Sequence, residues 1–549
     1  MRRAFSTRKW SAILFASIVA LPLLILFASW LQPATEVWQH LIATVLSDYV
    51  WNSIVLAVGV GSLSLLIGGT CAWCVAKYDF PLRTILRWLL LLPLAMPAYI
   101  IAYTYTGILD FAGPVQSSIR DWTGLRYGQY WFPDIQSLPG AVVMLALVLF
   151  PYVYLLALTA FQSQSPNLAY AAKSMGLNHS TYIRKVALPL ARPALLAGMA
   201  LTMMEAFADY GTVQYFGIPT FTTGIYRVWF GMNSQAAAAQ LSSALCLFVL
   251  LLLVFEEYSR RKQRFFEASA GQQHIALHRP TKFKALTLTL LVALPCIAGF
   301  IIPVVQLLSW SLQTWQHMFD DDFVQLLINS FGLALLSAVV IVLAALFLVY
   351  AMRSNKAMSN GAISTSMLGI SGKIAGLGYA IPGTVIAIGV MLPFAWLDKR
   401  VNEVLASWFE YEPGLIFSGT LFVVLFAYLV RFMTVAKHNV EAGMQRIKPS
   451  MDEAAQGMGL TARQILQRIH VPLLKSSVLS ALLLVFVDVM KELPATLILR
   501  PFNFNTLAVK TFELASDERL ADAALPAISI VIIGLLPIVL LARKIDAQN

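Results

Sequence analysis

The sequence predicts an all-α membrane protein of about twelve transmembrane helices, arranged as two parallel six-helix repeats. Three observations predict this fold class: an apolar composition, a series of stretches long enough to span a bilayer, and an internal duplication. Of the 549 residues, 58% are hydrophobic and only 12% are charged, and the mean hydropathy is +0.72. Soluble domains are about 25% charged, so a soluble fold is excluded.

A membrane helix needs about twenty consecutive apolar residues, and the chain offers twelve such stretches. Barrel strands would be shorter and would alternate in polarity, so helices are the spanning elements. The first stretch resembles a signal peptide, but its length predicts a membrane helix. The stretches lie at about 11–31, 51–76, 86–108, 138–161, 193–216, 236–256, 285–312, 325–352, 374–396, 415–436, 475–499 and 523–542.

Basic residues are unequally divided between the two sides of the predicted membrane. Of the 39 Lys and Arg residues, 30 fall on one side, with Arg431 counted among them, and eight fall on the other. The basic side of a membrane protein faces the cytoplasm, so both termini are expected there. Topology therefore explains the net charge of +11, and no nucleic-acid partner is expected.

Short sequences recur at a nearly constant distance. The segment 38–40 (Trp-Gln-His) recurs at 315–317, and Asn52-Ser53 recurs at 329–330, both displaced by 277 residues. Recurrence at a fixed distance indicates a duplicated unit, and a unit of six spans enters the membrane twice from the same side, which makes the repeat parallel. The predicted domains are a first half at 1–257, a basic cytoplasmic linker at 258–284 and a second half at 285–549.

Two polar loops, 164–192 and 437–475, contain related motifs that lie 283 residues apart. The motifs are Tyr170-Ala171-Ala172-Lys173-Ser174-Met175-Gly176 and Glu453-Ala454-Ala455-Gln456-Gly457-Met458-Gly459. Each follows a helix-capping residue and ends in a glycine suited to stop a helix. We expect each loop to form a short helix across the cytoplasmic face, whose alanines suit insertion into a partner's groove. The alternative is an ordinary connecting loop, which the equal spacing of the two copies disfavours.

This pattern resembles the EAA motif of binding-protein-dependent ABC importer permeases, and the resemblance covers nearly the whole chain as a fused pair of permease halves. It implies that the short helices couple to an ATPase. The first copy departs from the family by carrying Tyr170 where Glu is usual. The residues that the resemblance assigns to ATPase coupling are Tyr170, Ala171, Ala172, Gly176, Glu453, Ala454, Ala455 and Gly459.

The resemblance also implies partners and a location. The partners are two copies of a soluble ATPase on the cytoplasmic side, a periplasmic substrate-binding protein and membrane lipid, and the location is the bacterial inner membrane. Two further segments, 208–226 and 491–496, are similar to ferric-iron permeases. Thiamine and phosphonate-type permeases are close relatives and remain alternatives. The binding protein is expected to meet loops 109–135, 217–235 and 500–522.

Four carboxylates fall within two predicted spans: Glu205 and Asp209 in the fifth, Asp488 and Glu492 in the eleventh. The displacement of 283 residues superimposes the two pairs, and residues four apart share a helix face. An ionised side chain in a bilayer costs about 2.5–3.5 kcal/mol on insertion scales. We therefore expect these residues to line a translocation path between the halves. The alternative is that they cap or solvate helix ends.

No catalytic residue, metal site or bound cofactor is predicted. The chain lacks a Gly-x-x-x-x-Gly-Lys-Ser/Thr loop, and its seven His residues are scattered without a pair at ligand spacing. ATP is therefore expected to be hydrolysed by partner subunits. Three function classes are open: an ABC importer permease, a twelve-span secondary transporter and a membrane enzyme. The paired loops favour the first, and the absence of a catalytic constellation disfavours the third.

Overall fold

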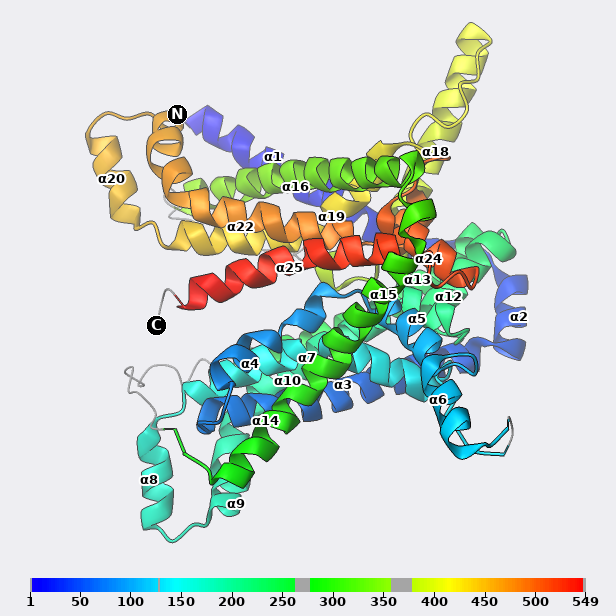
Figure 1. The fold of residues 1–549 in the computed structure, drawn as a ribbon. Coiled ribbons are helices and arrows are strands. Elements are labelled where there is room, and N and C mark those ends of the chain that lie inside the picture. Colours follow the sequence, from blue (N-terminus) through cyan, green and yellow to red (C-terminus); the bar gives the residue numbers. More distant parts are fainter. Residues whose placement is uncertain (1, 127–128, 262–276, 357–377, 547–549) are drawn as a thin grey trace. The chain divides into compact units, whose positions relative to one another are not determined.

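The computed structural model describes residues 2–126, 129–261, 277–356 and 378–546, and their regular elements are helices (Figure 1). Within these ranges nine helices are long and apolar enough to cross a membrane, or up to ten if one bent pair forms a single span. The all-helical membrane class is confirmed. The number twelve stays a prediction, because the stretch 374–396 begins outside the described residues and the last apolar helix is short, at Ala524–Val539.

The chain forms two compact units, each assembled from separate parts of the sequence. The first comprises Met1–Trp38, Ile225–Ser243 and Phe319–Lys510, and the second comprises Gln39–Gly224, Ala244–Met318 and Thr511–Asn549. The helices of the first unit are α1 (Arg2–Ala28), α16 (Asp321–Lys356), α18 (Gly383–Phe409), α19 (Leu421–Gln445), α20 (Pro449–Gly457), α21 (Ala462–Ile465), α22 (Val471–Met490) and α23 (Pro494–Leu499).

The second unit contains most of the remaining helices. They are α3 (Leu46–Lys77), α4 (Arg83–Leu89), α5 (Ala98–Leu109), α6 (Pro114–Thr123), α7 (Leu138–Gln162), α8 (Pro166–Ser174), α9 (His179–Tyr182), α10 (Leu188–Ala208), α11 (Gly211–Tyr215), α14 (Lys282–Cys296), α15 (Ile302–Met318) and α25 (Ala524–Asp546). Four helices cross a unit boundary: α2 (Thr35–Thr44), α12 (Phe221–Tyr226), α13 (Gln235–Arg261) and α24 (Leu507–Ser516).

Helices α3 and α10 pack closely on α7 because glycines face it. A Cβ on Gly68 would lie 2.7 Å from the carbonyl oxygen of Phe150, and one on Gly198 would lie 2.7 Å from the Cα of Val153. Small residues allow such approach between membrane helices, where packing rather than the hydrophobic effect drives association. Phe150 and Tyr154 are fully buried at this contact. These three helices form the core of the second unit and lead into the first polar loop.

The compact units do not follow the predicted sequence halves. Helix α1, from the first half, packs on α16 and α18 of the second half, with the rings of Phe15 and Phe347 6.3 Å apart. In the other unit, the hydroxyl of Tyr105 donates to the carbonyl of Ala298, at 2.7 Å. Each half therefore places its first span against helices of the other half. The boundaries at 258–284 stay a prediction based on the repeat.

A proline lies within each of two predicted spans, Pro97 in 86–108 and Pro382 in 374–396, and precedes a helix. Pro97 directly precedes α5 and Pro382 directly precedes α18, and both have ψ of 142°. A residue at the start of a helix can be proline because its missing N–H would have no partner inside the helix. The predicted span 86–108 is bent, because the chain turns by 94° between Arg83–Ala95 and Ala98–Thr123, and it stays a prediction that this bent pair forms a single span.

Candidate functional site

Each polar loop contains the predicted short helix, α8 in the second unit and α20 in the first. In Figure 1 each projects from the end of the long helices of its own unit. Each helix is followed by a glycine in the left-handed region, Gly176 with φ +76° and Gly459 with φ +81°. A side chain at either position would be strained, because this conformation favours glycine. The helix and its glycine stop are thus observed in both loops.

The same hydrogen bond closes both helices. The N–H of Leu177 donates to the carbonyl of Ala172 at 3.0 Å, and the N–H of Leu460 donates to the carbonyl of Ala455 at 3.1 Å. This bond is the mark of the Schellman motif. Ala172 and Ala455 are buried, at 2% and 0% exposure, so neither alanine lies on the exposed face of its short helix.

The position at which the two motif copies differ lies on the surface of each short helix. Tyr170 is 64% exposed, and Glu453 at the corresponding place is also exposed. Ala171 and Ala454 beside them are exposed as well. A docking partner would therefore meet an aromatic ring on α8 and a carboxylate on α20.

A π-helical turn connects each short helix to the next span. It covers Ile183–Ala187 in the first loop and Leu466–His470 in the second, and α10 and α22 begin immediately afterwards. Pro189 and Pro472 are the second residues of those helices. Because proline lacks an N–H and its ring crowds the carbonyl four residues earlier, a wider turn before it accommodates the proline.

The first short helix rests on apolar side chains. Ala172, Tyr182 and Ala187 form a buried cluster, and Trp73 of α3 packs against it. Lys77, whose Nζ lies 5.8 Å from the centre of the Trp73 ring, donates to the carbonyl of Phe161 at the end of α7, at 2.8 Å. In the part of this loop that the structure describes, shape and apolar contact hold α8 to its unit.

The second short helix is held by charge. Asp452 of α20 accepts from Arg353 Nε at 3.0 Å and lies 2.8 Å from His470 Nε2. Arg353 also donates to the carbonyls of Met444 and Ile447, at 2.7 and 3.0 Å. The side chains of Arg353 and Asp452 are only 17% and 16% exposed. This arginine therefore fastens α20 to both α16 and the end of α19.

We predict that Asp452→Asn loosens α20. The substitution removes the negative charge of the carboxylate that both Arg353 and His470 contact. A hydrogen bond to a charged group contributes about 2 kcal/mol, so the equilibrium constant for local opening of α20 should rise roughly 30-fold. Amide hydrogen exchange of the full-length chain should therefore become faster over residues 449–457. Glu453→Gln is the matched control, since it removes one charge from the exposed neighbour. Equal acceleration in both variants would contradict the assignment.

Two of the four predicted carboxylates cap short helices that follow a span. Asp209 accepts from the N–H of Val213 at 3.1 Å and from the hydroxyl of Thr212 at 3.1 Å, at the start of α11. Glu492 accepts from the N–H of Ala495 at 3.1 Å, at the start of α23. A carboxylate at this place satisfies an N–H that the helix cannot pair itself. Capping was the alternative to lining a path, and path lining stays a prediction.

Glu492 also forms an ion pair with Arg431 of α19, with Nε and Oε2 3.1 Å apart and side-chain exposures of only 4% and 13%. Arg431 Nη1 reaches the start of α18, where a Cβ on Gly383 would lie 2.3 Å away. Only glycine leaves room for the guanidinium there. Within the described residues this Nη1 has no hydrogen-bond partner.

Arg431 is the functional candidate that the sequence reasoning missed. Its assignment to a cytoplasmic loop is wrong, because it lies ten residues inside α19, a candidate membrane span. The signal was present: the predicted stretch 415–436 already included this residue. A cation within an apolar stretch should have been matched with a carboxylate of another span.

The other two carboxylates are less enclosed. Asp488 lies 3.4 Å from Lys491 Nζ on the same helix end, and both side chains are partly exposed. Glu205 is half-buried on α10. The two positions of the repeat therefore differ in their secondary structure. Glu205 and Asp488 lie within the long helices α10 and α22, whereas Asp209 and Glu492 follow the ends of these helices.

Asp522 lies at the end of the expected outer loop 500–522, and its carboxylate has polar partners on two sides. Burial alone would raise the pKa of Asp522, but hydrogen bonds from His317 and Arg519 outweigh it and hold the pKa below its usual value. The carboxylate lies 2.9 Å from His317 Nε2 and accepts from Arg519 Nε at 2.8 Å. These bonds tie the start of α25 to the end of α15.

The double variant Arg431→Met with Glu492→Gln tests the ion pair. Arg431→Met alone leaves a buried carboxylate unpaired, which typically costs about 3–5 kcal/mol, so the purified full-length chain should melt at a lower temperature. The double variant should recover most of that loss. Lys491→Gln is the control, since partly exposed pairs contribute about 0–1 kcal/mol. A melting temperature unchanged in the Arg431 variant would refute the energetic role of the pair.

Comparison with known proteins identifies the family. Residues 64–262 and 369–547, more than half of the chain, match the family model of the binding-protein-dependent transport system inner membrane component. The chain belongs to this family. It is a multi-pass inner membrane protein, the permease component of an ABC transporter, and it is not itself an enzyme. The family works with a binding protein and an ATPase, and each matched segment contains one of the two polar loops.

Individual relatives differ in length and in substrate. The chain is 24% identical over 543 residues to the Fe(3+)-transport system permease protein FbpB 2 of Haemophilus influenzae, covering 97% of this chain and 98% of that protein. It is 24% identical over 230 residues to the molybdenum transport system permease protein ModB of Escherichia coli K12, and the aligned segment covers 40% of this chain and 97% of that protein. It is 30% identical to the putative 2-aminoethylphosphonate transport system permease protein PhnV of Salmonella typhimurium, covering 30% of this chain and 56% of that protein.

Proposed function

We propose that this chain is the transmembrane permease subunit of an ATP-driven ABC importer and that it translocates ferric iron delivered by a periplasmic binding protein. The observation that carries the choice of iron is the full-length similarity to a ferric-iron permease, which covers 97% of this chain at 24% identity. Carboxylates near the span ends suit a hard trivalent cation. Iron is here the cargo, and no resident metal site is part of the proposal.

The proposed architecture is of the type I importer kind. It has twelve spans in two parallel six-helix repeats, with both termini in the cytoplasm, where two copies of the ATPase bind α8 and α20. ATP binding and hydrolysis by those subunits would drive the transport cycle. The binding protein would dock on the opposite side, where Trp122, Trp131 and Phe502 are 93%, 87% and 96% exposed. Exposed aromatic side chains are frequent anchors of protein interfaces.

The experiment that tests this function is stimulation of ATP hydrolysis in proteoliposomes. They would contain the full-length chain with its ATPase, and purified binding proteins would be added with and without ligand. We expect a ferric-iron-loaded binding protein to stimulate hydrolysis and to drive iron uptake. Gly176→Val with Gly459→Val should abolish copurification of the ATPase, because both glycines have left-handed backbone that valine rarely adopts. Uptake that persists without any ATPase would favour a secondary transporter.

A phosphonate or other oxyanion is the second candidate substrate, and thiamine is a further alternative. The specific observation for an anion is Arg431, a cation within a candidate span whose Nη1 has no hydrogen-bond partner among the described residues. The relatives that carry molybdenum and 2-aminoethylphosphonate in their names support this alternative. If a molybdate-loaded or phosphonate-loaded binding protein stimulated ATP hydrolysis and the iron-loaded one did not, the cargo would be an oxyanion and not iron.

The translocation path is tested through the two carboxylates that lie within long helices. Changing Glu205 and Asp488 to Ala together should reduce uptake sharply while the chain is still expressed and inserted. The isosteric pair Glu205→Gln and Asp488→Asn separates charge from shape, since it keeps the hydrogen-bonding groups. Normal uptake in the alanine variant would contradict the prediction that these two residues line the path. Glu441→Gln, on the cytoplasmic end of α19, is the control for loss of a charge.

A further inference from the structure

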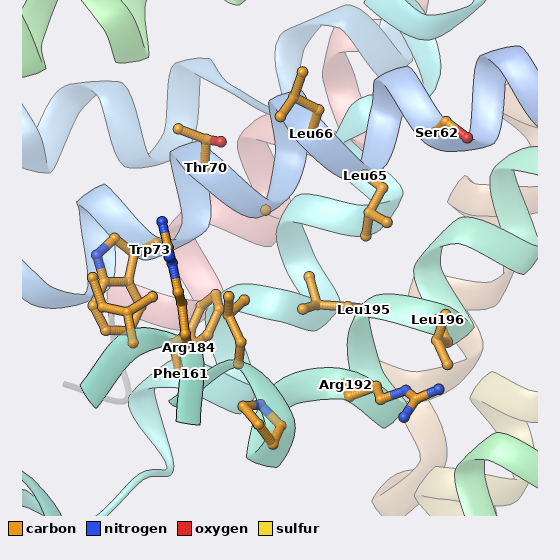
Figure 2. A pocket seen from close by; sticks show the side chains of 14 residues that line it. Ser62, Leu65, Leu66, Thr70, Trp73, Phe161, Arg184, Arg192, Leu195 and Leu196 are labelled. Atoms are coloured by element: carbon orange, nitrogen blue, oxygen red, sulfur yellow. The ribbon is translucent and has the colours of Figure 1, made fainter. Parts of the chain in front are cut away.

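An open groove lies within the second unit between α3 and α10 (Figure 2). Its volume is about 760 Å³. Leu65 of α3 faces Leu195 of α10 across it, as Figure 2 shows, and Leu66 and Leu196 also line it. Leu66 is 66% exposed, so the apolar wall is not covered by the rest of its unit. The groove suits a hydrocarbon chain.

Two arginines add positive charge to this apolar groove. Arg184 belongs to the π-helical turn and Arg192 to the start of α10, and both line it. Both are exposed, and neither makes an ion pair with another residue that the structure describes. No carboxylate lines the groove. Guanidinium groups bind phosphate oxygens in a bidentate manner.

The groove has the depth of one membrane leaflet. Its α3 wall runs from Ser62 to Trp73, and at 1.5 Å per residue this length is roughly 16 Å. The hydrocarbon core of a bilayer is about 30 Å thick. The arginines follow the first coupling loop, on the side that carries the excess of basic residues and therefore faces the cytoplasm. The groove thus reaches from the cytoplasmic surface to about the bilayer centre.

We propose that this groove binds an anionic phospholipid of the cytoplasmic leaflet. The phosphate of the headgroup binds the guanidinium group of Arg184 beside Trp73, Arg192 adds positive charge further along the groove, and an acyl chain lies along the leucines of α3 and α10. Basic pockets between membrane helices on the cytoplasmic side are typical sites for anionic headgroups. A zwitterionic lipid lacks the net charge to match two unpaired arginines.

The lipid would contact side chains that pack beneath α8, the short helix of the first polar loop. Trp73 and Ile183 line the groove, and both also pack against the cluster of Ala172, Tyr182 and Ala187 that carries α8. Lipid occupancy therefore orders the same side chains that hold α8. The second coupling helix is fastened by Arg353 and Asp452 instead, so the lipid acts on one loop of the two.

Native mass spectrometry of the delipidated full-length chain tests the site, with phosphatidylglycerol and phosphatidylcholine of the same acyl chains added separately. We expect phosphatidylglycerol to be retained in preference to phosphatidylcholine. Each basic side chain near an anionic surface contributes about fivefold to binding, so Arg184→Gln with Arg192→Gln should weaken phosphatidylglycerol binding roughly 30-fold. Arg468→Gln with Lys475→Gln removes the same charge from the exposed surface of the second loop and should leave binding unchanged.

Trp73 provides a second measurement that does not depend on the arginine variants. Phosphatidylglycerol with brominated acyl chains should quench the fluorescence of the unmodified chain more than that of Trp73→Phe, since the groove brings the chain beside this indole. Equal retention of the two lipids, equal loss in both double-glutamine variants, or quenching that does not depend on Trp73 would each overturn the proposal.

Discussion

A helix that ends within or beside a bilayer leaves backbone N–H and C=O groups that water cannot satisfy, and the interior of this protein depends on how those groups are paired. Spans are interrupted before α5 and α18, and short helices follow α10 and α22. At the last two breaks a carboxylate caps the next helix, Asp209 in one unit and Glu492 in the other. Intramembrane acidic residues here therefore have a structural role before any role in transport.

The two caps show how a duplicated unit can diverge without losing its backbone. Among the described residues, the carboxylate of Asp209 accepts hydrogen bonds from the turn that follows it, through Thr212 and Val213. Glu492 is longer by one methylene and also reaches Arg431 on a separate helix. The residue 283 positions before Arg431 is Val148, so the first half has no cation there to pair. One repeat thus joins α19 to the start of α23 through charge, whereas the other keeps the cap alone.

The sequence predicted the features that local chemistry encodes. Apolar runs of bilayer length predict membrane helices, and glycine after a short capped helix predicts α8 and α20 with their left-handed ends. It could not predict that α1 packs on α16 and α18, because lipid-facing and helix-facing residues are equally apolar and a hydropathy pattern does not name the partner. The bend at Pro97 was hidden for the same reason, since both sides of the break are apolar. Arg431 was missed because residues were counted by loop and its distant partner was not sought.

The two polar loops share a backbone but differ in what holds their short helices, since α20 is held by the ion pair of Asp452 with Arg353 and α8 by apolar contacts. His470 and Asp452 have no counterpart in the first loop, where Ala187 and Ala169 occupy the corresponding positions, so the ion pair cannot form there. Tyr182, at the position of Ile465, instead belongs to the buried apolar cluster against which Trp73 packs. Hydrogen bonds between charged groups fix direction and distance, whereas apolar contacts tolerate sliding at little cost. A force applied to α20 is therefore passed to α16 and α19 through a fixed geometry, while a force on α8 passes through side chains that also line an open groove.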